Sequence, residues 1–200
     1  MKILISGFKP FNQENINPSI LIANKLKETH KDIEVIELNV EYNNDSNKLL
    51  NKIRQSNPNI IILLGQAGGR SKVSLEYFAL NMQSAPIKDN KGELILNRTI
   101  NENGNEAYKS TIDLKQIVSD INEEQLAISY HAGTFICNEI YYNALKYIQD
   151  NNLNIPCVFI HIPYIKEQIV GKNNVLYLEF DESYKIIEKV LCEIKKSIVM

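Results

Sequence analysis

Short apolar runs alternate along this chain with longer segments in which apolar residues recur every three or four positions. The runs predict buried strands, and the spaced segments predict amphipathic helices. The predicted strands are Lys2–Ser6, Ile33–Val40, Asn59–Leu64, Ala127–Tyr130 and Cys157–Ile162. The predicted helices are Pro18–Thr29, Asp45–Gln55, Leu114–Ile121, Thr134–Gln149 and Ser183–Ile198. This strand–helix order is typical of an α/β domain with a mostly parallel sheet.

The middle of the chain departs from this order. Val73–Met82 alternates only weakly, and Ala85–Asn105 is rich in Asn, Asp, Lys and Gly. We expect a hairpin or a long loop here, laid over one edge of the sheet. Beyond the last predicted strand, an edge strand or a contact is predicted from the apolar residues Val175, Leu176, Leu178 and Phe180. Because no repeat or linker divides the chain, residues 1–200 are predicted to form one domain, a three-layer α/β/α sandwich with a twisted, mixed, mostly parallel sheet.

Composition and charge exclude several classes of protein. The hydrophobic fraction of 44% and the charged fraction of 23% are ordinary for a globular domain. The formal net charge of −2 gives no basic excess for nucleic acid or an anionic membrane. No apolar stretch approaches the roughly 20 residues of a membrane span, and the first one is too short for a signal peptide. The three cysteines form no C-x-x-C pair, so we expect a cytoplasmic protein without disulfides, metal or cofactor.

Cys137 has the most reactive predicted setting of the three cysteines. It follows a predicted strand and Gly133, and it lies at the start of a predicted helix. The helix dipole and the unpaired N–H groups there favour a thiolate and can hold an oxyanion. A buried structural cysteine is the competing interpretation, and it is preferred for Cys157 and Cys192.

His161 is the candidate base, because it ends a predicted strand at the sheet edge where ligands gather in parallel α/β folds. His131 precedes the Cys137 loop and is a rival base, whereas His30 is expected to cap a helix. Glu76 is a candidate for orienting an imidazole. The Gly65–Arg70 segment follows a central strand but lacks a phosphate-binding pattern.

Over nearly its whole length, the sequence resembles the pyroglutamyl peptidase I family of cysteine peptidases, also called pyrrolidone-carboxylate peptidases. The resemblance rests on long motifs in the family's order: Gly7-Phe8-Lys9-Pro10-Phe11, Asn17-Pro18-Ser19, Gly65-Gln66-Ala67-Gly68-Gly69-Arg70, Glu76 with Ala79 and Asn81, Asp89-Asn90, Ala132-Gly133-Thr134-Phe135-Ile136-Cys137-Asn138, and His161-Ile162-Pro163-Tyr164 with Glu167-Gln168.

The resemblance implies a function and a set of site residues. It implies a cysteine exopeptidase that removes N-terminal pyroglutamate from peptides through a thioester intermediate. It places the nucleophile at Cys137, the base at His161 and the acidic third member at Glu76. The implied substrate-binding residues are Phe8, Phe11, Asn17, Gln66, Ile87, Phe135 and Ile136. It also implies a homotetramer.

The sequence departs from the family pattern at several positions. Asn12-Gln13 replaces a Gly-Gly pair, and Tyr77 and Pro86 stand where the family has arginines. A cation at position 86 could help to hold the oxyanion, so Arg70 or Lys88 is considered as a substitute source of charge. Two alternatives therefore stay open: a related cysteine amidase with an altered substrate or low activity, and a non-catalytic binding protein on the same fold.

Overall fold

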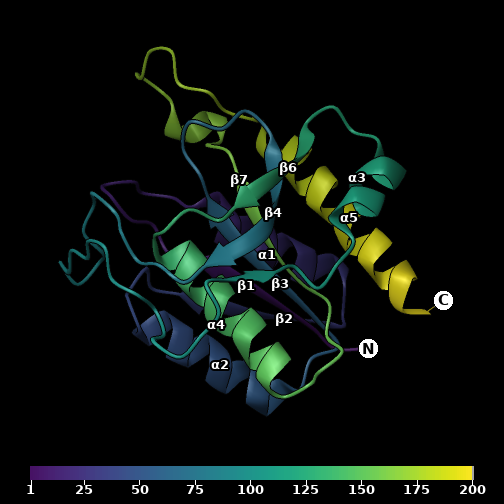
Figure 1. The fold of residues 1–200 in the computed structure, drawn as a ribbon. Coiled ribbons are helices and arrows are strands. Elements are labelled where there is room, and N and C mark those ends of the chain that lie inside the picture. Colours follow the sequence, from purple (N-terminus) through teal and green to yellow (C-terminus); the bar gives the residue numbers. More distant parts are fainter. Residues whose placement is uncertain (200) are drawn as a thin grey trace.

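The fold is a seven-stranded sheet between two layers of helices, as a computed structural model describes it for residues 1–199 (Figure 1). The strands are β1 (Ile3–Phe8), β2 (Ile33–Leu38), β3 (Ile60–Gln66), β4 (Val73–Leu80), β5 (Ala107–Lys109), β6 (Leu126–His131) and β7 (Cys157–Ile162). The helices are α1 (Pro18–Thr29), α2 (Asn44–Ser56), α3 (Leu114–Ile121), α4 (Ile136–Asp150) and α5 (Phe180–Val199), with a short 3₁₀ turn, η1, at Lys166–Gln168.

The sheet is mixed and mostly parallel, as predicted. Its order is β2-β1-β3-β7-β4-β5, and β6 also pairs with β4. The pairs β1–β2, β1–β3, β3–β7 and β4–β6 are parallel, whereas β4 runs antiparallel to both β7 and β5. One apolar core joins the sheet to α1, α3 and α5, and the other joins it to α2 and α4. The prediction of an α/β/α sandwich is therefore confirmed.

Local sequence explains why these elements form. Every residue of β1, β3 and β7 is buried, as expected for strands covered by helices on both faces. Helix α1 begins with Pro18 at a position that tolerates proline, and the Asn17 side chain accepts the backbone N–H of Ser19. His30 is the C-terminal cap of α1, as expected.

The prediction for the middle of the chain is wrong in one respect. Val73–Leu80 is not a hairpin over an edge but the strand β4, which lies between β7 and β6 inside the sheet. Its weak alternation reflects burial on both faces over its first half. The long segment between β4 and β5 is a loop, as expected, with one isolated bridge between Gln83 and Arg98.

The region after β7 also differs from the prediction. The apolar residues near Leu178 form no edge strand, only one bridge between Tyr164 and Tyr177. Helix α5 begins at Phe180, three residues before its predicted start at Ser183. The earlier start follows from local chemistry, since Asp181 and Glu182 favour a helix N-terminus.

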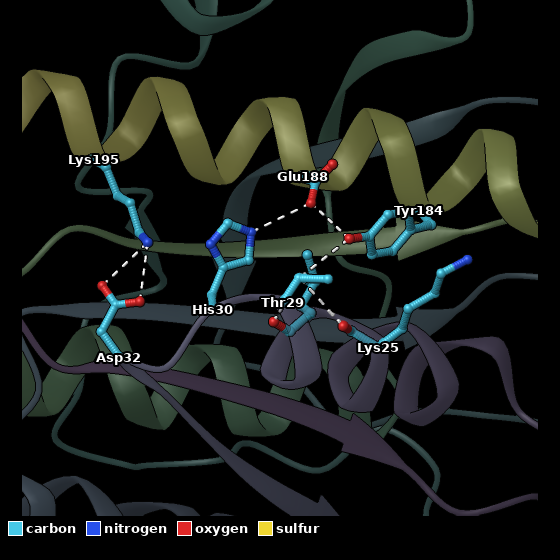
Figure 2. Close-up of polar contacts among 8 residues, drawn as sticks. Lys25, Thr29, His30, Asp32, Tyr184, Glu188 and Lys195 are labelled. Carbon is cyan, nitrogen blue, oxygen red and sulfur yellow. Dashed lines mark hydrogen bonds and ion pairs between the residues drawn. The ribbon is translucent and has the colours of Figure 1, made fainter.

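Polar contacts fasten α5 to α1 and to the loop that follows it (Figure 2). Tyr184 donates a hydrogen bond to Glu188 at 2.6 Å, and Glu188 lies 3.3 Å from the Nε2 atom of His30. Lys195 pairs with Asp32 at 3.1 Å. These contacts lie along one side of the apolar face of α5, whose Ile187, Val190 and Leu191 are completely buried. They fix the C-terminal helix on the outside of the sheet.

Candidate active site

A buried glutamate and a buried histidine meet on adjacent strands. Glu76 lies on β4 and His161 on the antiparallel strand β7, where Ser74 is the direct partner of His161. The two side chains are therefore diagonal neighbours on one face. The Nδ1 atom of His161 lies 2.7 Å from Oε1 of Glu76, and neither side chain is more than 6% exposed. An ionised Glu76 accepts the Nδ1–H group, which leaves the Nε2 lone pair free to take a proton.

Arg70 makes this pair a triplet of charged or ionisable groups. Its Nη1 atom donates to the same Oε1 atom of Glu76, at 2.6 Å, and its side chain is 29% exposed. Arg70 follows the Gly68-Gly69 turn after β3, so this glycine-rich segment places the Arg70 guanidinium beside Glu76. Sequence reasoning had considered Arg70 as a source of positive charge, but not as the partner of Glu76.

Cys137 lies in the first turn of α4, as predicted. The turn before it passes through Gly133, whose φ of +78° suits glycine. The N-cap residue of α4, Phe135, makes no side-chain hydrogen bond to the helix. The first backbone N–H groups of a helix have no intrahelical acceptor, so the N–H groups around Cys137 are available for an oxyanion.

Glycine at position 65 allows the Cys137 sulfur to approach the sheet. A Cβ atom at Gly65 would lie 3.0 Å from Cys137 Sγ and 2.6 Å from the ring of Phe159. Gly65 is also the register partner of His161 on β7. The sulfur therefore lies against the strand position that neighbours the histidine. The fold brings Cys137, His161 and Glu76 from α4, β7 and β4 to one region.

Hydrogen bonds hold the first turn of α4 against the end of β4. The buried Asn138 side chain accepts the N–H of Leu80 and donates to the carbonyls of Leu80 and Met82. One turn further on, the Tyr141 hydroxyl donates to the backbone carbonyl of Glu76 at 3.1 Å. The helix that carries Cys137 is thus fixed directly to the strand that carries Glu76.

Burial controls the protonation of this site. Burial raises the pKa of the Cys137 thiol to about 12, and the Glu76 charge adds to this rise. Burial also lowers the pKa of His161, although Glu76 opposes that shift. The pKa of Glu76 is lowered: burial acts to raise it, but its hydrogen bond to His161 and the charges of His161 and Arg70 outweigh burial.

These shifts give a neutral thiol, a neutral imidazole and an ionised carboxylate near pH 7. The sequence expectation of a thiolate considered only the helix N-terminus, and desolvation outweighs that effect here. A neutral imidazole is the form of His161 that can accept the thiol proton.

Aromatic side chains gather beside Cys137. The Phe11 and Phe135 rings are 6.1 Å apart, and Tyr42 packs edge-on against Phe135 at 5.4 Å. Phe8 and Ile136 belong to the same apolar cluster, whereas Ile87 is half-buried in the loop after β4, outside it. Sequence reasoning missed Tyr42, which lies between predicted elements and has no motif of its own.

The two candidate polar residues, Asn17 and Gln66, have different partners. Asn17 is 1% exposed; its oxygen accepts from Ser19, and its amide donates to the carbonyl of Lys9. The Asn17 side chain therefore shapes the loop that carries Phe8 and Phe11. Gln66 ends β3 and accepts a hydrogen bond from Gln168 at 2.7 Å.

The remaining candidates have weaker geometry. His131 is exposed, and its Nδ1 atom accepts the N–H of Gly133. Cys157 is completely buried in the sheet, and Cys192 is half-buried on α5. Pro86 and Lys88 are both exposed. The structure thus favours His161 over His131 and Arg70 over Lys88.

Within residues 1–199, no group of three or more His, Cys, Asp or Glu side chains is arranged to hold a metal ion. One hollow of about 710 Å³ is lined by α3, α5 and neighbouring loops, away from Cys137. In the same residues, no helix has the length and apolar character that a membrane span requires.

Comparison with known proteins gives one consistent result. The pyroglutamyl peptidase family model matches residues 1–177. The chain is 42% identical to a pyrrolidone-carboxylate peptidase of Brachyspira hyodysenteriae, over 96% of this chain and 97% of that protein. It is 39% identical to pyrrolidone-carboxylate peptidase 1 of Caldanaerobacter subterraneus, over 98% of this chain and 99% of the relative.

Solved structures show the same fold. The crystal structure of pyroglutamyl peptidase I from Bacillus amyloliquefaciens has a TM-score of 0.88 at 33% identity, covering 94% of each chain. A mutant pyrrolidone carboxyl peptidase from Pyrococcus furiosus has a TM-score of 0.91 at 31% identity, covering 100% of both chains. By sequence and by fold, this chain belongs to the pyroglutamyl peptidase family of cysteine peptidases.

Proposed function

We propose that this protein is a cysteine exopeptidase that removes N-terminal pyroglutamate from peptides, with Cys137 as nucleophile, His161 as base and Glu76 as the residue that orients His161. The observation that carries the proposal is the buried Glu76–His161 contact of 2.7 Å beside the Cys137 sulfur. A nucleophile, a base and a third group that orients the base are the parts of a nucleophilic hydrolase.

In the proposed reaction, the Cys137 sulfur attacks the carbonyl carbon that joins pyroglutamate to the next residue. The thiol proton passes to Nε2 of His161, and the carbonyl oxygen becomes an oxyanion near the first N–H groups of α4. His161 then gives that proton to the leaving amine as the C–N bond breaks. The pyroglutamyl thioester remains on Cys137, and His161 activates a water molecule to hydrolyse it.

The proposed pocket suits a small uncharged ring. Phe8 and Ile136 belong to the apolar core against which Phe11, Phe135 and Cys137 pack, and Gln66 ends β3 next to Gly65, the position that faces the Cys137 sulfur. An apolar wall with a few polar groups is the common form of a small-ligand site. An ordinary N-terminal ammonium would be buried there without a counter-charge, which is costly. The pocket therefore selects pyroglutamate over unmodified N-termini. Ile87 and Asn17 complete the proposed set of substrate-binding residues.

Two further properties belong to this proposal. We propose that residues 1–200 act as one cytoplasmic catalytic domain, and that the protein is a homotetramer like the family it resembles. Light scattering coupled to gel filtration tests the second point, since a monomer would contradict it.

The test of the activity is release of a fluorophore from pyroglutamyl-7-amido-4-methylcoumarin. We expect turnover by the native protein, and none by Cys137→Ala. The alanyl and prolyl amides of the same fluorophore should not be cleaved. Cleavage of these amides in preference to the pyroglutamyl one would indicate an amidase with another substrate. No cleavage of any of them would indicate a binding protein.

A further inference from the structure

The carboxylate of Glu76 has one oxygen with two partners and one oxygen with none. Oε1 lies 2.7 Å from Nδ1 of His161 and accepts the Nη1 donor of Arg70 at 2.6 Å. Oε2 is buried, and no hydrogen-bond partner for it is found within residues 1–199. The Glu76 side chain is 0% exposed, so bulk water does not reach this oxygen. A buried charged oxygen without a donor is costly, so a donor close to Oε2 is the expected arrangement.

Strand pairing places one hydroxyl directly across from Glu76. On the β7 side the opposite residue is Phe159, which has no polar side-chain atom. On the β6 side the opposite residue is Ser129, in a parallel register. Directly opposite residues point to the same face of a sheet, and neighbouring strands lie about 4.8 Å apart. Ser129 is therefore the residue of β6 whose hydroxyl can reach Oε2.

The Ser129 hydroxyl makes only a weak bond elsewhere. Its Oγ atom lies 3.4 Å from the backbone carbonyl of His131, which is long for an O–H···O bond, usually about 2.5–3.0 Å. The hydroxyl is also close enough to the Glu76 carboxylate to act, by a hydrogen bond, toward a lower pKa of that group. A serine hydroxyl rotates to suit its partner, so turning toward Oε2 exchanges a long neutral bond for a charge-assisted one.

The other groups around Glu76 have different roles. The titratable and charged groups that face it are His161 from β7, Arg70 from the turn after β3, and Cys137 and Tyr141 from α4. The Tyr141 hydroxyl donates to the backbone carbonyl of Glu76 and not to its carboxylate. On β6, the exposed His131 lies two residues beyond Ser129. Ser129 is thus the neutral donor that this arrangement offers to Oε2.

We propose that Ser129 is a positioning residue, whose hydroxyl donates to Oε2 of Glu76 and holds the carboxylate with Oε1 toward His161 and Arg70. This inference rests on the proposed function, in which Glu76 orients His161. A carboxylate held at both oxygens cannot turn about its terminal bond, so Oε1 stays directed at the Nδ1–H group of the imidazole. Ser129 acts on the reaction only through Glu76.

The substitution Ser129→Ala tests the inference through the pH dependence of kcat/KM for the pyroglutamyl amide. In the active form Glu76 is ionised and His161 is neutral. Loss of the hydroxyl leaves the carboxylate charge less stabilised, so the pair takes up its next proton at a higher pH, whichever residue binds it. We expect the midpoint of the acid limb to move upward by about one pH unit. At higher pH, kcat should fall while KM stays within about twofold, because Glu76 acts on the base and not on substrate binding.

The matched control is Ser129→Thr, which keeps the hydroxyl and suits a strand. Its acid limb should have the same midpoint as that of the native protein. A merely structural role of the Ser129 side chain would lower stability or rate without this selective movement of the acid limb.

Nuclear magnetic resonance of protein with labelled histidine rings measures the same change without turnover. The chain has three histidines, so each ring signal can be assigned by substitution. The midpoint reported by the His161 ring should move upward by about one pH unit in Ser129→Ala and stay in place in Ser129→Thr. The His30 ring should titrate alike in all three proteins, because its partner Glu188 lies outside the site.

The possible results separate the inference from the proposed function. An upward shift of the His161 midpoint in Ser129→Ala but not in Ser129→Thr would support the role of Ser129 even if no amide is cleaved, and in that case the proposed function would fail. No upward shift in Ser129→Ala, or equal shifts in both variants, would overturn that role even if the pyroglutamyl amide is cleaved. If Ser129→Ala does not fold, Ser129→Cys replaces it in the same comparison, since a thiol is a weaker donor of similar size.

Discussion

The Glu76–His161 pair and the Glu188–His30 pair join the same residue types in different surroundings. Glu76 and His161 are 2.7 Å apart on neighbouring strands and almost completely buried. Glu188 and His30 are 3.3 Å apart at the surface of α5 and α1, with side chains 33% and 22% exposed (Figure 2). Only the first pair has a cysteine sulfur at the adjacent sheet position.

The comparison shows that residue types alone do not define a catalytic pair. Burial lowers the pKa of His161, whereas the contacts with His161 and Arg70 lower the pKa of Glu76 against the effect of burial. The low local dielectric also strengthens the electrostatic contact between the two side chains. Water surrounds part of the other pair, which also includes the Tyr184 hydroxyl. The proposed function gives catalysis to the buried pair, whereas the exposed pair joins α5 to the end of α1. Substitutions in the buried pair should therefore lower activity, whereas equivalent substitutions in the exposed pair should leave activity unchanged.

The largest difference is expected for the histidines. His161→Ala removes the base, so kcat should fall by about 10²–10⁴-fold. His30→Ala should leave kcat unchanged and lower the free energy of unfolding by less than about 1 kcal/mol. Steady-state kinetics and urea unfolding of both variants measure the two effects. A similar loss of activity in His30→Ala would remove the distinction between the pairs.

The difference in kcat between the variants of the two glutamates should be smaller than that between the histidine variants. Glu76→Gln keeps the size of the side chain but removes the charge that stabilises the protonated imidazole, so we expect kcat to fall by about 10²-fold or more. Glu188→Gln should retain full activity, since its partners Tyr184 and His30 lie outside the site. Assays of the two variants side by side would contradict the assignment if Glu76→Gln were the more active one.

Arg70 should have a more moderate effect. Arg70→Ala leaves the buried Glu76 with one fewer partner, and we expect kcat/KM to fall about tenfold. Lys88→Ala is the matched control, because Lys88 is exposed and should not affect the rate. Pro86→Arg should also give little gain, since Arg70 already supplies a cation to this region. A larger loss from Lys88→Ala than from Arg70→Ala would reverse this conclusion.

The smallest expected effect is that of raising the pH above 7 on kcat/KM. The lowered pKa of His161 keeps its imidazole neutral from the ordinary value of 6.5 upward, so kcat/KM should be nearly constant between pH 7 and 9. Below the His161 pKa, protonation should remove the base and reduce kcat/KM, and the same acid limb should remain in His30→Ala. Glu76 stays ionised throughout, because its pKa is lowered. A rise with an apparent pKa between 8 and 9 would mean that catalysis requires a preformed thiolate.

Much of this fold could be predicted from the sequence because three of its seven strands are short, fully buried apolar runs. β1, β3 and β7 belong to this group, and their edges agree with the prediction to within two residues. β4 was misassigned because its sequence, with Glu76 at its centre, does not look like an interior strand. A buried glutamate is stable there only because His161 and Arg70 arrive from other parts of the chain.

The motifs of the family resemblance propose residues for the candidate site but not their contacts. They propose Cys137, His161 and Glu76, and they carry no information about Arg70 as the second partner of Glu76. The contacts of Arg70, Tyr42 and Gln168 depend on how segments distant in the sequence fold together, and the spacing of apolar residues does not predict them. The Asn12-Gln13 pair gives a further example, since both residues have positive φ values, 52° and 65°. Left-handed backbone suits a Gly-Gly pair, so the loop keeps a conformation that its own residues do not indicate.

The most direct test of the central claim is to trap the covalent intermediate. The native protein is mixed with pyroglutamyl-7-amido-4-methylcoumarin, quenched in acid during turnover, digested and examined by mass spectrometry. We expect a pyroglutamyl adduct on the peptide that contains Cys137, and much less of it in His161→Ala, because His161 is needed to form the thioester. The adduct should be absent from Cys137→Ala, while Cys157→Ser and Cys192→Ser should retain it. An adduct on Cys157 or Cys192, or full turnover by Cys137→Ala, would contradict the assignment of Cys137 as the nucleophile.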